Sequence, residues 1–138
     1  IFEGEYLNGK RNGKGKEYFN NDKLKFEGEY LEGKKWNGNG YNYNNQLEFE
    51  IKDGKGKIKE YNIYGKLIFD VEYLNGERNG KGKEYHDNGK LKFEGEYLNN
   101  ERNSKGKEYY DNGKLLFEGE YLFGQRNGKG NYYLKVNT

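Results

Sequence analysis

Pairs of carboxylates separated by one residue recur along this chain. The pairs are Glu3/Glu5, Glu27/Glu29, Glu94/Glu96 and Glu118/Glu120. Two carboxylates facing each other across a cleft can hydrolyse a glycosidic bond, because one donates a proton while the other attacks the sugar or activates water. That chemistry requires one pair in one cleft, whereas these pairs are periodic. We therefore interpret them as part of a solvated face.

Side chains that normally act as nucleophiles or metal ligands are scarce. The chain of 138 residues has one His (His86), one Ser (Ser104), one Thr (Thr138) and no Cys. A nucleophilic triad or a zinc site needs several such groups together, and the Asp-Asn-Gly segments lack the spacing of a calcium loop. His86 stands where the related segment has the second residue of Tyr109-Tyr110, so we interpret it as a packing or surface substitute. We predict no enzymatic activity, no metal and no cofactor.

Basic residues recur around one turn of each repeat and form a second candidate site. Stacking of the repeats would align them into a basic edge that binds anionic lipid headgroups or an acidic partner. The alternative is that they are solvated turn residues balanced by Glu77 and Glu101. A net charge of only +2 argues against nucleic acid, whose phosphates require excess positive charge. The edge residues are Arg11, Lys14, Arg78, Lys81, Arg102, Lys105, Arg126 and Lys129.

Aromatic residues provide the third candidate site. We predict that Trp36 and a recurring tyrosine contact a partner; the tyrosines are Tyr6, Tyr30, Tyr73, Tyr97 and Tyr121. Trp36 is expected in an expanded turn before an irregular repeat, where it either covers a gap or anchors a partner.

Composition indicates a thin aromatic core. A mean hydropathy of −1.39 and 31% hydrophobic residues would ordinarily favour disorder. However, aromatic residues make up 17% of the chain and the 35% charged residues are mixed in sign, so we expect a folded chain. No apolar run is long enough to cross a membrane. The chain opens at Ile1 inside a repeat, so we expect a fragment; a cytoplasmic or membrane-associated location is favoured.

One hexapeptide sets the organisation of the chain. Phe-Glu-Gly-Glu-Tyr-Leu or a variant of it begins at Phe2, Phe26, Phe49 (degenerate), Phe69, Phe93 and Phe117, at intervals of 20 to 24 residues. Regular recurrence at this period is the signature of a repeat array. The sequence predicts one array over residues 1–138. The copy at Phe49 is expected to lack about six residues of its hairpin and to carry extra residues near 61–64.

Within a unit, alternation of apolar and charged residues predicts a strand over 2–6, and Lys14 to Phe19 a return strand. Asn8-Gly9 and Asn12-Gly13 are expected to form turns. Glu3 and Glu5 should face Lys14 and Lys16, while Gly4 and Gly15 should leave room for a ring of the neighbouring hairpin. The prediction is an all-β, elongated, single-layer solenoid of stacked antiparallel β-hairpins.

These motifs resemble the MORN repeat (membrane occupation and recognition nexus), with Phe2, Gly4, Tyr6, Asn8-Gly9 and Gly13-Lys14-Gly15 matching its pattern. The segment from Tyr109 to Leu115 is similar to the MORN variant repeats of bacterial antitoxin-like proteins. The resemblance implies an elongated antiparallel β groove used for protein scaffolding, dimerisation and contact with anionic membranes.

The leading functional prediction is a non-catalytic scaffold that holds an extended peptide of a protein partner on a concave aromatic face or along a repeat edge, and that can self-associate into a homo-oligomer. One alternative is a peripheral membrane module that binds anionic phospholipid through the basic edge. A second is a carbohydrate-binding, cell-wall-type aromatic repeat.

Overall fold

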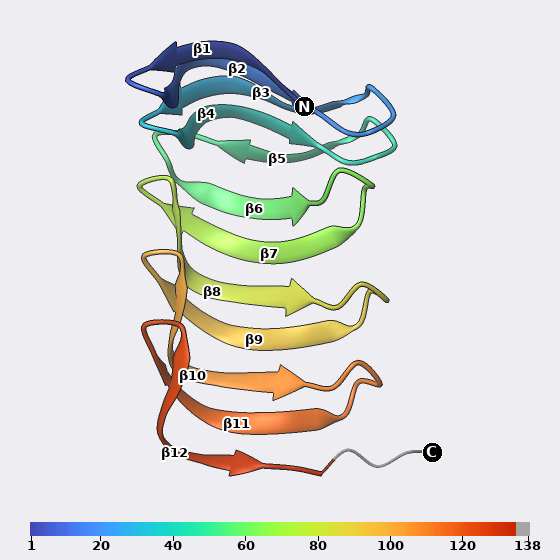
Figure 1. Cartoon of the computed structure of the whole chain (residues 1–138), viewed down its shortest axis with the longest axis vertical. Helices are drawn as coiled ribbons and strands as arrows, with labels where there is room; N and C mark the ends of the chain where they lie inside the picture. Colours follow the sequence, from blue (N-terminus) through green and yellow to red (C-terminus); the bar gives the residue numbers. More distant parts are fainter. Residues whose placement is uncertain (135–138) are drawn as a thin grey trace.

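All of the regular structure in residues 1–134, the part that the computed structural model describes, is antiparallel β-strand. Figure 1 shows the strands following one another in sequence order along the long axis of the molecule. No helix in these residues is long and apolar enough to span a membrane. The strands are β1 (Phe2–Leu7), β2 (Lys10–Tyr18), β3 (Leu24–Leu31), β4 (Lys34–Tyr41), β5 (Leu47–Ile51), β6 (Gly56–Tyr61), β7 (Leu67–Leu74), β8 (Glu77–Tyr85), β9 (Leu91–Leu98), β10 (Glu101–Tyr109), β11 (Leu115–Leu122) and β12 (Gln125–Tyr132).

The hairpins form two sheets in place of the single continuous sheet that we expected. One runs from β1 to β5 and the other from β6 to β12, and within each sheet every strand pairs with its neighbours in sequence. The hairpin that joins β5 to β6 keeps an isolated bridge between Lys52 and Lys55. The prediction of an all-β hairpin array is confirmed, with one interruption in its backbone pairing.

Turn residues explain the regular hairpins. Asn8 and Gly9 adopt φ angles of 52° and 79°, the left-handed conformation that a tight two-residue hairpin turn requires. The expected second turn at Asn12-Gly13 was wrong, because Gly13 lies inside β2. Its φ of 86° coincides with a register shift between β1 and β2, so this glycine forms a bulge.

Glycine and aromatic residues interlock on one face of each sheet, which we call the aromatic face. Gly82, Gly95 and Gly106 pair across successive strands. A Cβ added to Gly82 would lie 2.9 Å from the ring of Tyr97, which belongs to the next hairpin. The predicted space for a neighbouring ring is confirmed at Gly15, which lies under Tyr30 of the next hairpin, whereas Gly4 makes room for Phe2 of its own strand. Phe93 is fully buried in the equivalent core of the second sheet.

The hairpin turns are also linked to one another through the backbone. The N–H of Asn100 donates to the carbonyl of Arg78 at 3.0 Å, and the N–H of Gly124 donates to that of Arg102 at 3.1 Å. Successive hairpins are thus joined at their turns as well as through the sheet, so the array stacks with a constant offset.

Branched aliphatic residues replace glycine where the two sheets meet. Ile51, Ile58 and Val71 occupy the glycine positions there and are buried. Ile51 and Ile58 share a core cluster with Phe26 and Tyr30, so residues of both sheets pack together. These branched side chains fill the space between the two sheets, which aromatic rings packed over glycines fill in the other repeats.

The expected lengths in the irregular repeat need correction. Ile51 and Ile58 are seven positions apart, where the equivalent Gly4 and Gly15 are eleven apart. The connector from 61 to 67 has the same length as the connector from 85 to 91, so it carries no extra residues. The whole deficit of this repeat lies in the β5–β6 hairpin.

Candidate functional site

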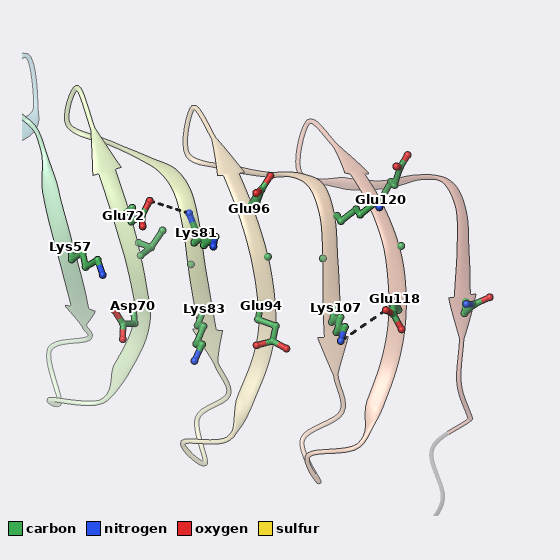
Figure 2. Close-up of a pocket in the computed structure, with 17 residues that line it drawn as sticks. Lys57, Asp70, Glu72, Lys81, Lys83, Glu94, Glu96, Lys107, Glu118 and Glu120 are labelled. Atoms are coloured by element: carbon green, nitrogen blue, oxygen red, sulfur yellow. Dashed lines mark hydrogen bonds and ion pairs between the residues drawn. The ribbon is translucent and has the colours of Figure 1, made fainter.

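A long groove lies on the face opposite the aromatic one, across β6 to β12 (Figure 2). Its volume is about 1100 Å³. Backbone forms most of its floor, because the side chain of Val71 and the Cβ that each glycine lacks point to the aromatic face, so that only backbone lies between the charged side chains of each strand. The floor residues are Val71, Gly82, Gly95, Gly106 and Gly119. We call this cavity the charged groove.

Lysines and carboxylates flank this floor in bands that alternate in sign from strand to strand. The charged groups are Asp70 and Glu72 on β7, Lys81 and Lys83 on β8, Glu94 and Glu96 on β9, Lys105 and Lys107 on β10, and Glu118 and Glu120 on β11. The strand register creates this order: Lys83 lies opposite Glu94, and Lys107 lies opposite both Glu94 and Glu118. The expected pairing of Glu with Lys across strands is confirmed for Glu3, which lies opposite Lys16, while the register shift between Gly4 and Tyr6 interrupts the ladder at Glu5.

Ion pairs in the charged groove are loose. The Nζ of Lys107 lies 4.0 Å from a carboxylate oxygen of Glu118, and the two side chains are 45% and 46% exposed. Such pairs contribute about 0–1 kcal/mol, since water screens them and holding two long side chains together costs entropy. Lys107 and Glu118 can therefore turn toward another molecule at little cost, whereas Glu94 accepts a hydrogen bond of 2.7 Å from the hydroxyl of Tyr109.

Ion pairs on the aromatic face are tight by comparison. The Nε of Arg102 lies 2.7 Å from Glu84, and the Tyr97 hydroxyl donates to the same carboxylate at 2.6 Å. The guanidinium of Arg102 also lies 4.2 Å from the ring centroid of Phe93, where a cation is attracted by the ring. This arrangement holds neighbouring hairpins together.

Proton affinities on the aromatic face reflect these contacts. Burial alone would raise the pKa of Glu84, but the hydrogen bonds from Arg102 and Tyr97 lower it below its ordinary value. Burial and the adjacent Glu84 carboxylate together raise the pKa of Tyr97. The carboxylate stays ionised and the phenol stays protonated near neutral pH, so the network is stable there.

The tyrosines predicted to meet a partner are core residues in most repeats. Tyr30, Tyr97 and Tyr121 are 3–4% exposed, because the ring of each packs over a glycine of the preceding hairpin. Tyr73 is partly buried against the core, and Tyr6, on the edge strand β1, is exposed. Burial corrects the interpretation of Tyr30, Tyr97 and Tyr121 as partner contacts.

The predicted basic edge does not form as one surface, because its arginines and lysines lie on opposite faces. The arginines lie on the aromatic face, each over the ring of a Phe: Arg11, Arg78, Arg102 and Arg126 over Phe2, Phe69, Phe93 and Phe117. Each also forms an ion pair with a Glu. Lys81 and Lys105 line the charged groove, and Lys14 lines a smaller hollow over β1 to β3. The side chain of Lys129 lies outside the described part of the structure.

Trp36 lies within β4, so its expected place in an expanded turn was wrong. Its carbonyl accepts a hydrogen bond of 2.8 Å from the N–H of Gly54, in the turn between β5 and β6. A Cβ added to Gly54 would lie 2.7 Å from the indole ring. The half-buried ring therefore covers the shortened hairpin, one of the two roles considered for it.

His86 and Ser104, the nucleophile-type residues within the described part of the chain, lie on different elements. The Nε2 of His86 lies 2.8 Å from the carbonyl oxygen of Tyr109 in the next connector. The Oγ of Ser104 accepts a hydrogen bond from Asn103 on β10, and Thr138 lies outside the described residues. Within residues 1–134, no three His, Asp or Glu side chains are grouped so as to hold a metal ion.

Sequence reasoning did not identify the groove, although its signal is visible. Glu-Gly-Glu and Lys-Gly-Lys triplets alternate along the chain, and the carboxylates among them were interpreted only as a solvated face. Each triplet places two like charges around a glycine on one strand. Pairing of the strands then sets a Lys-Gly-Lys triplet beside a Glu-Gly-Glu triplet. The alternation of triplets predicts the banded pattern once the register is known.

The fold and the groove define an antiparallel β-hairpin repeat module with one structural face and one open, charged face. The chain belongs to the MORN repeat family: the family model matches residues 2–23, 72–90, 93–114 and 117–136. Modules built from such repeats often bind membranes or proteins. The unmatched interval from 24 to 71 contains the junction between the sheets. No curated protein matches the chain in a sequence comparison.

Proposed function

We propose that the array is a non-catalytic protein-binding module whose charged groove holds an extended segment of a partner. The binding face differs from the one that the sequence suggested: the face with the large hollow is charged, and the aromatic rings are used for packing. One observation carries the proposal, namely the glycine floor of the groove between bands of loosely paired charges.

The shape and chemistry of the groove favour a polypeptide over a small molecule. Small-molecule sites are mostly apolar and enclosed, whereas this groove is open and flanked by charge along its length. Another chain can approach the floor closely, because only backbone lies between the charged side chains that flank it. A peptide can meet charged side chains at several repeats at once, so many weak contacts add up.

Selection from a displayed library of random peptides on the intact chain tests the proposal. Selected peptides should lose affinity at least tenfold for a Lys83→Gln/Lys107→Gln variant, which removes two positive charges from the groove. The matched control is Lys90→Gln/Lys114→Gln, which removes the same charge from exposed connectors. Selected peptides that bind both variants as well as they bind the unmodified chain would contradict the proposal.

A second candidate is binding to a membrane surface through the hairpin turns. Leu31, Leu74, Leu98 and Leu122 end the first strand of their hairpins and are 43–46% exposed, and Phe123 in the last turn is 80% exposed. Exposed apolar groups at turn tips can enter the headgroup region of a bilayer. The arginines of the predicted basic edge add little, because each is paired with a carboxylate.

Sedimentation with vesicles containing phosphatidylserine tests this second function. Leu98→Ser together with Phe123→Ser should reduce the bound fraction severalfold, because both changes remove exposed apolar surface without removing charge. Unchanged sedimentation of this variant, or no binding of the unmodified chain at low salt, would eliminate the membrane candidate.

A further inference from the structure

The spacing of charge in the groove points to the conformation and sequence of its ligand. We propose that the charged groove binds a polyproline II segment in which acidic and basic residues each recur at every third position. This inference rests on the proposed function and specifies the partner more closely. Three steps support it: the period of the charged bands, the placement of like charges around each glycine, and the weakness of the pairs that a ligand must replace.

The period comes from the sheet itself. Strands β7 to β11 alternate in sign, so bands of like charge are two strands apart. Neighbouring strands lie about 4.8 Å apart, which places like-charged bands about 9.6 Å apart along the groove. A ligand that lies across the strands meets the same charge at that interval.

Among regular conformations, polyproline II matches this interval best. Three residues of polyproline II advance about 9.3 Å, only about 0.3 Å short of the band spacing. Seven residues of an α-helix, the repeat of one helix face, advance about 10.5 Å, so the mismatch is about three times larger. Residues on one side of a β-strand recur at about 6.7 Å and miss every second band. Each charged row of a polyproline II ligand thus keeps a nearly constant offset from the bands of one sign along the groove.

The groove can also receive both signs of charge from one ligand. Lys81 and Lys83 flank Gly82, so a carboxylate above this glycine lies between two ammonium groups. On the next strand Glu94 and Glu96 offer the same arrangement to a basic side chain. Polyproline II has three rows of side chains; an acidic row and a basic row can face the floor while the third, where proline fits, faces solvent.

The ion pairs of the groove compete only weakly with such a ligand, although the hydroxyl of Tyr109 holds Glu94 through a hydrogen bond of 2.7 Å. The Lys107–Glu118 pair is long and half exposed, unlike the 2.7 Å pair of Arg102 with Glu84 on the aromatic face. A polyproline II segment is already extended before it binds, so little conformational entropy is lost on association. Its backbone has no internal hydrogen bonds and remains solvated in an open groove.

The length of the groove sets the length of the ligand. From β6 to β12 there are six strand intervals, or about 29 Å at the usual strand spacing. Polyproline II covers that distance with about nine residues. Three acidic-basic-proline triplets therefore fill the groove, and a twelve-residue probe leaves one triplet to spare.

Fluorescence anisotropy with three labelled twelve-residue peptides tests the inference. One repeats Glu-Lys-Pro four times, and the second has the same residues in three blocks. The third has the same four Glu and four Lys with Ala in place of the four Pro, and each Glu stands four residues before a Lys so that the peptide favours a helix. We expect the triplet peptide to bind the intact chain at least tenfold more tightly than the others. Its affinity should fall at least tenfold with Lys83→Gln/Lys107→Gln and stay unchanged with Lys90→Gln/Lys114→Gln. Thermal melts confirm that each variant is folded.

The outcomes separate this inference from the proposed function. Equal affinity for the triplet and block peptides would show that binding depends on composition alone, which overturns the inference. Tighter binding of the helical peptide, weakened by the groove variant, also overturns it but leaves the peptide-binding function in place. If none of the three peptides binds, the inference fails, and the selection from a random library decides the proposed function independently.

Discussion

The hydroxyl of Tyr97 donates a hydrogen bond of 2.6 Å to the carboxylate of Glu84, thirteen residues earlier in the chain. Tyr121 donates to Glu108 at 2.5 Å with the same separation in sequence. Each carboxylate also accepts a bond from an arginine that follows that tyrosine, Arg102 for Glu84 and Arg126 for Glu108. One glutamate per repeat thus joins its own hairpin to the next, so the contact is a property of the array.

Removal of the Tyr97 hydroxyl should destabilise the protein. Tyr97→Phe keeps the ring in the core but deletes a hydrogen bond to a charged group, so the free energy of unfolding should fall by about 1.5–3 kcal/mol. Urea denaturation followed by circular dichroism measures the change. Tyr64→Phe is the matched control, because Tyr64 is exposed. Equal stability of the two variants would show that the Glu84 contact does not hold the hairpins together.

A side chain at Gly95 should disrupt the interlocked core. A Cβ there would lie 2.7 Å from the ring of Phe93 and 2.9 Å from the backbone of Gly106, so Gly95→Val must move a ring and a paired strand. We expect a loss of about 3 kcal/mol, at the upper end of overpacking effects. Gly89→Asn is the control, since nothing lies within 4 Å of that position and Asn tolerates its positive φ. A melting temperature of Gly95→Val equal to that of the unmodified chain would refute the stacking model.

Ser104 is a position where a substitution should stabilise the protein. Its φ of 59° is left-handed, and the equivalent bulge positions in β2 and β8 hold Gly13 and Gly80. A non-glycine residue in that conformation costs about 1–2 kcal/mol. Ser104→Gly should therefore raise the free energy of unfolding by about 1 kcal/mol, after allowance for the greater entropy of unfolded glycine. A lower melting temperature for this variant would contradict the assignment of a strained bulge.

Acid should destabilise the array within a defined pH range. Burial alone would raise the pKa of Glu17, but the ammonium of Lys35 and the hydroxyl of Tyr30 lower it from 4.5 to about 2. A carboxyl whose pKa is lower in the folded state stabilises the protein above its unfolded pKa and loses that contribution as the pH falls. The stability contributed by Glu17 should thus be complete above about pH 4.5 and should decrease toward pH 2.

Urea midpoints measured between pH 7 and pH 2 check this prediction. Glu17→Gln should be less stable than the unmodified chain at pH 7 and should approach it at pH 2, since the amide does not titrate. Glu32→Gln, in an exposed turn, serves as the control. A constant difference between Glu17→Gln and the unmodified chain across this range would show that the Glu17 carboxylate is not the titrating group.

Much of this fold could be predicted from the sequence, because the contacts that define each hairpin join residues that are close in sequence. The period of Phe-Glu-Gly-Glu-Tyr-Leu and the Asn8-Gly9 turn predict antiparallel hairpins, because a two-residue turn can join only antiparallel strands. Asn12-Gly13 was misinterpreted for a related reason: a left-handed glycine serves a turn and a bulge equally well, and only the partner strand distinguishes them. The break between β5 and β6 was also missed, because it depends on how Ile51 and Ile58 pack.

The sequence by itself determined which residues belong to one repeat, where the chain turns, and that glycines and rings alternate. Only the tertiary structure decided which face is hollow and which is filled. The same alternation of charged and apolar residues fits a solvated charged face over an aromatic groove equally well. The choice depends on whether Tyr97 and its equivalents reach back over the glycines of the preceding hairpin, and that is settled by packing between repeats.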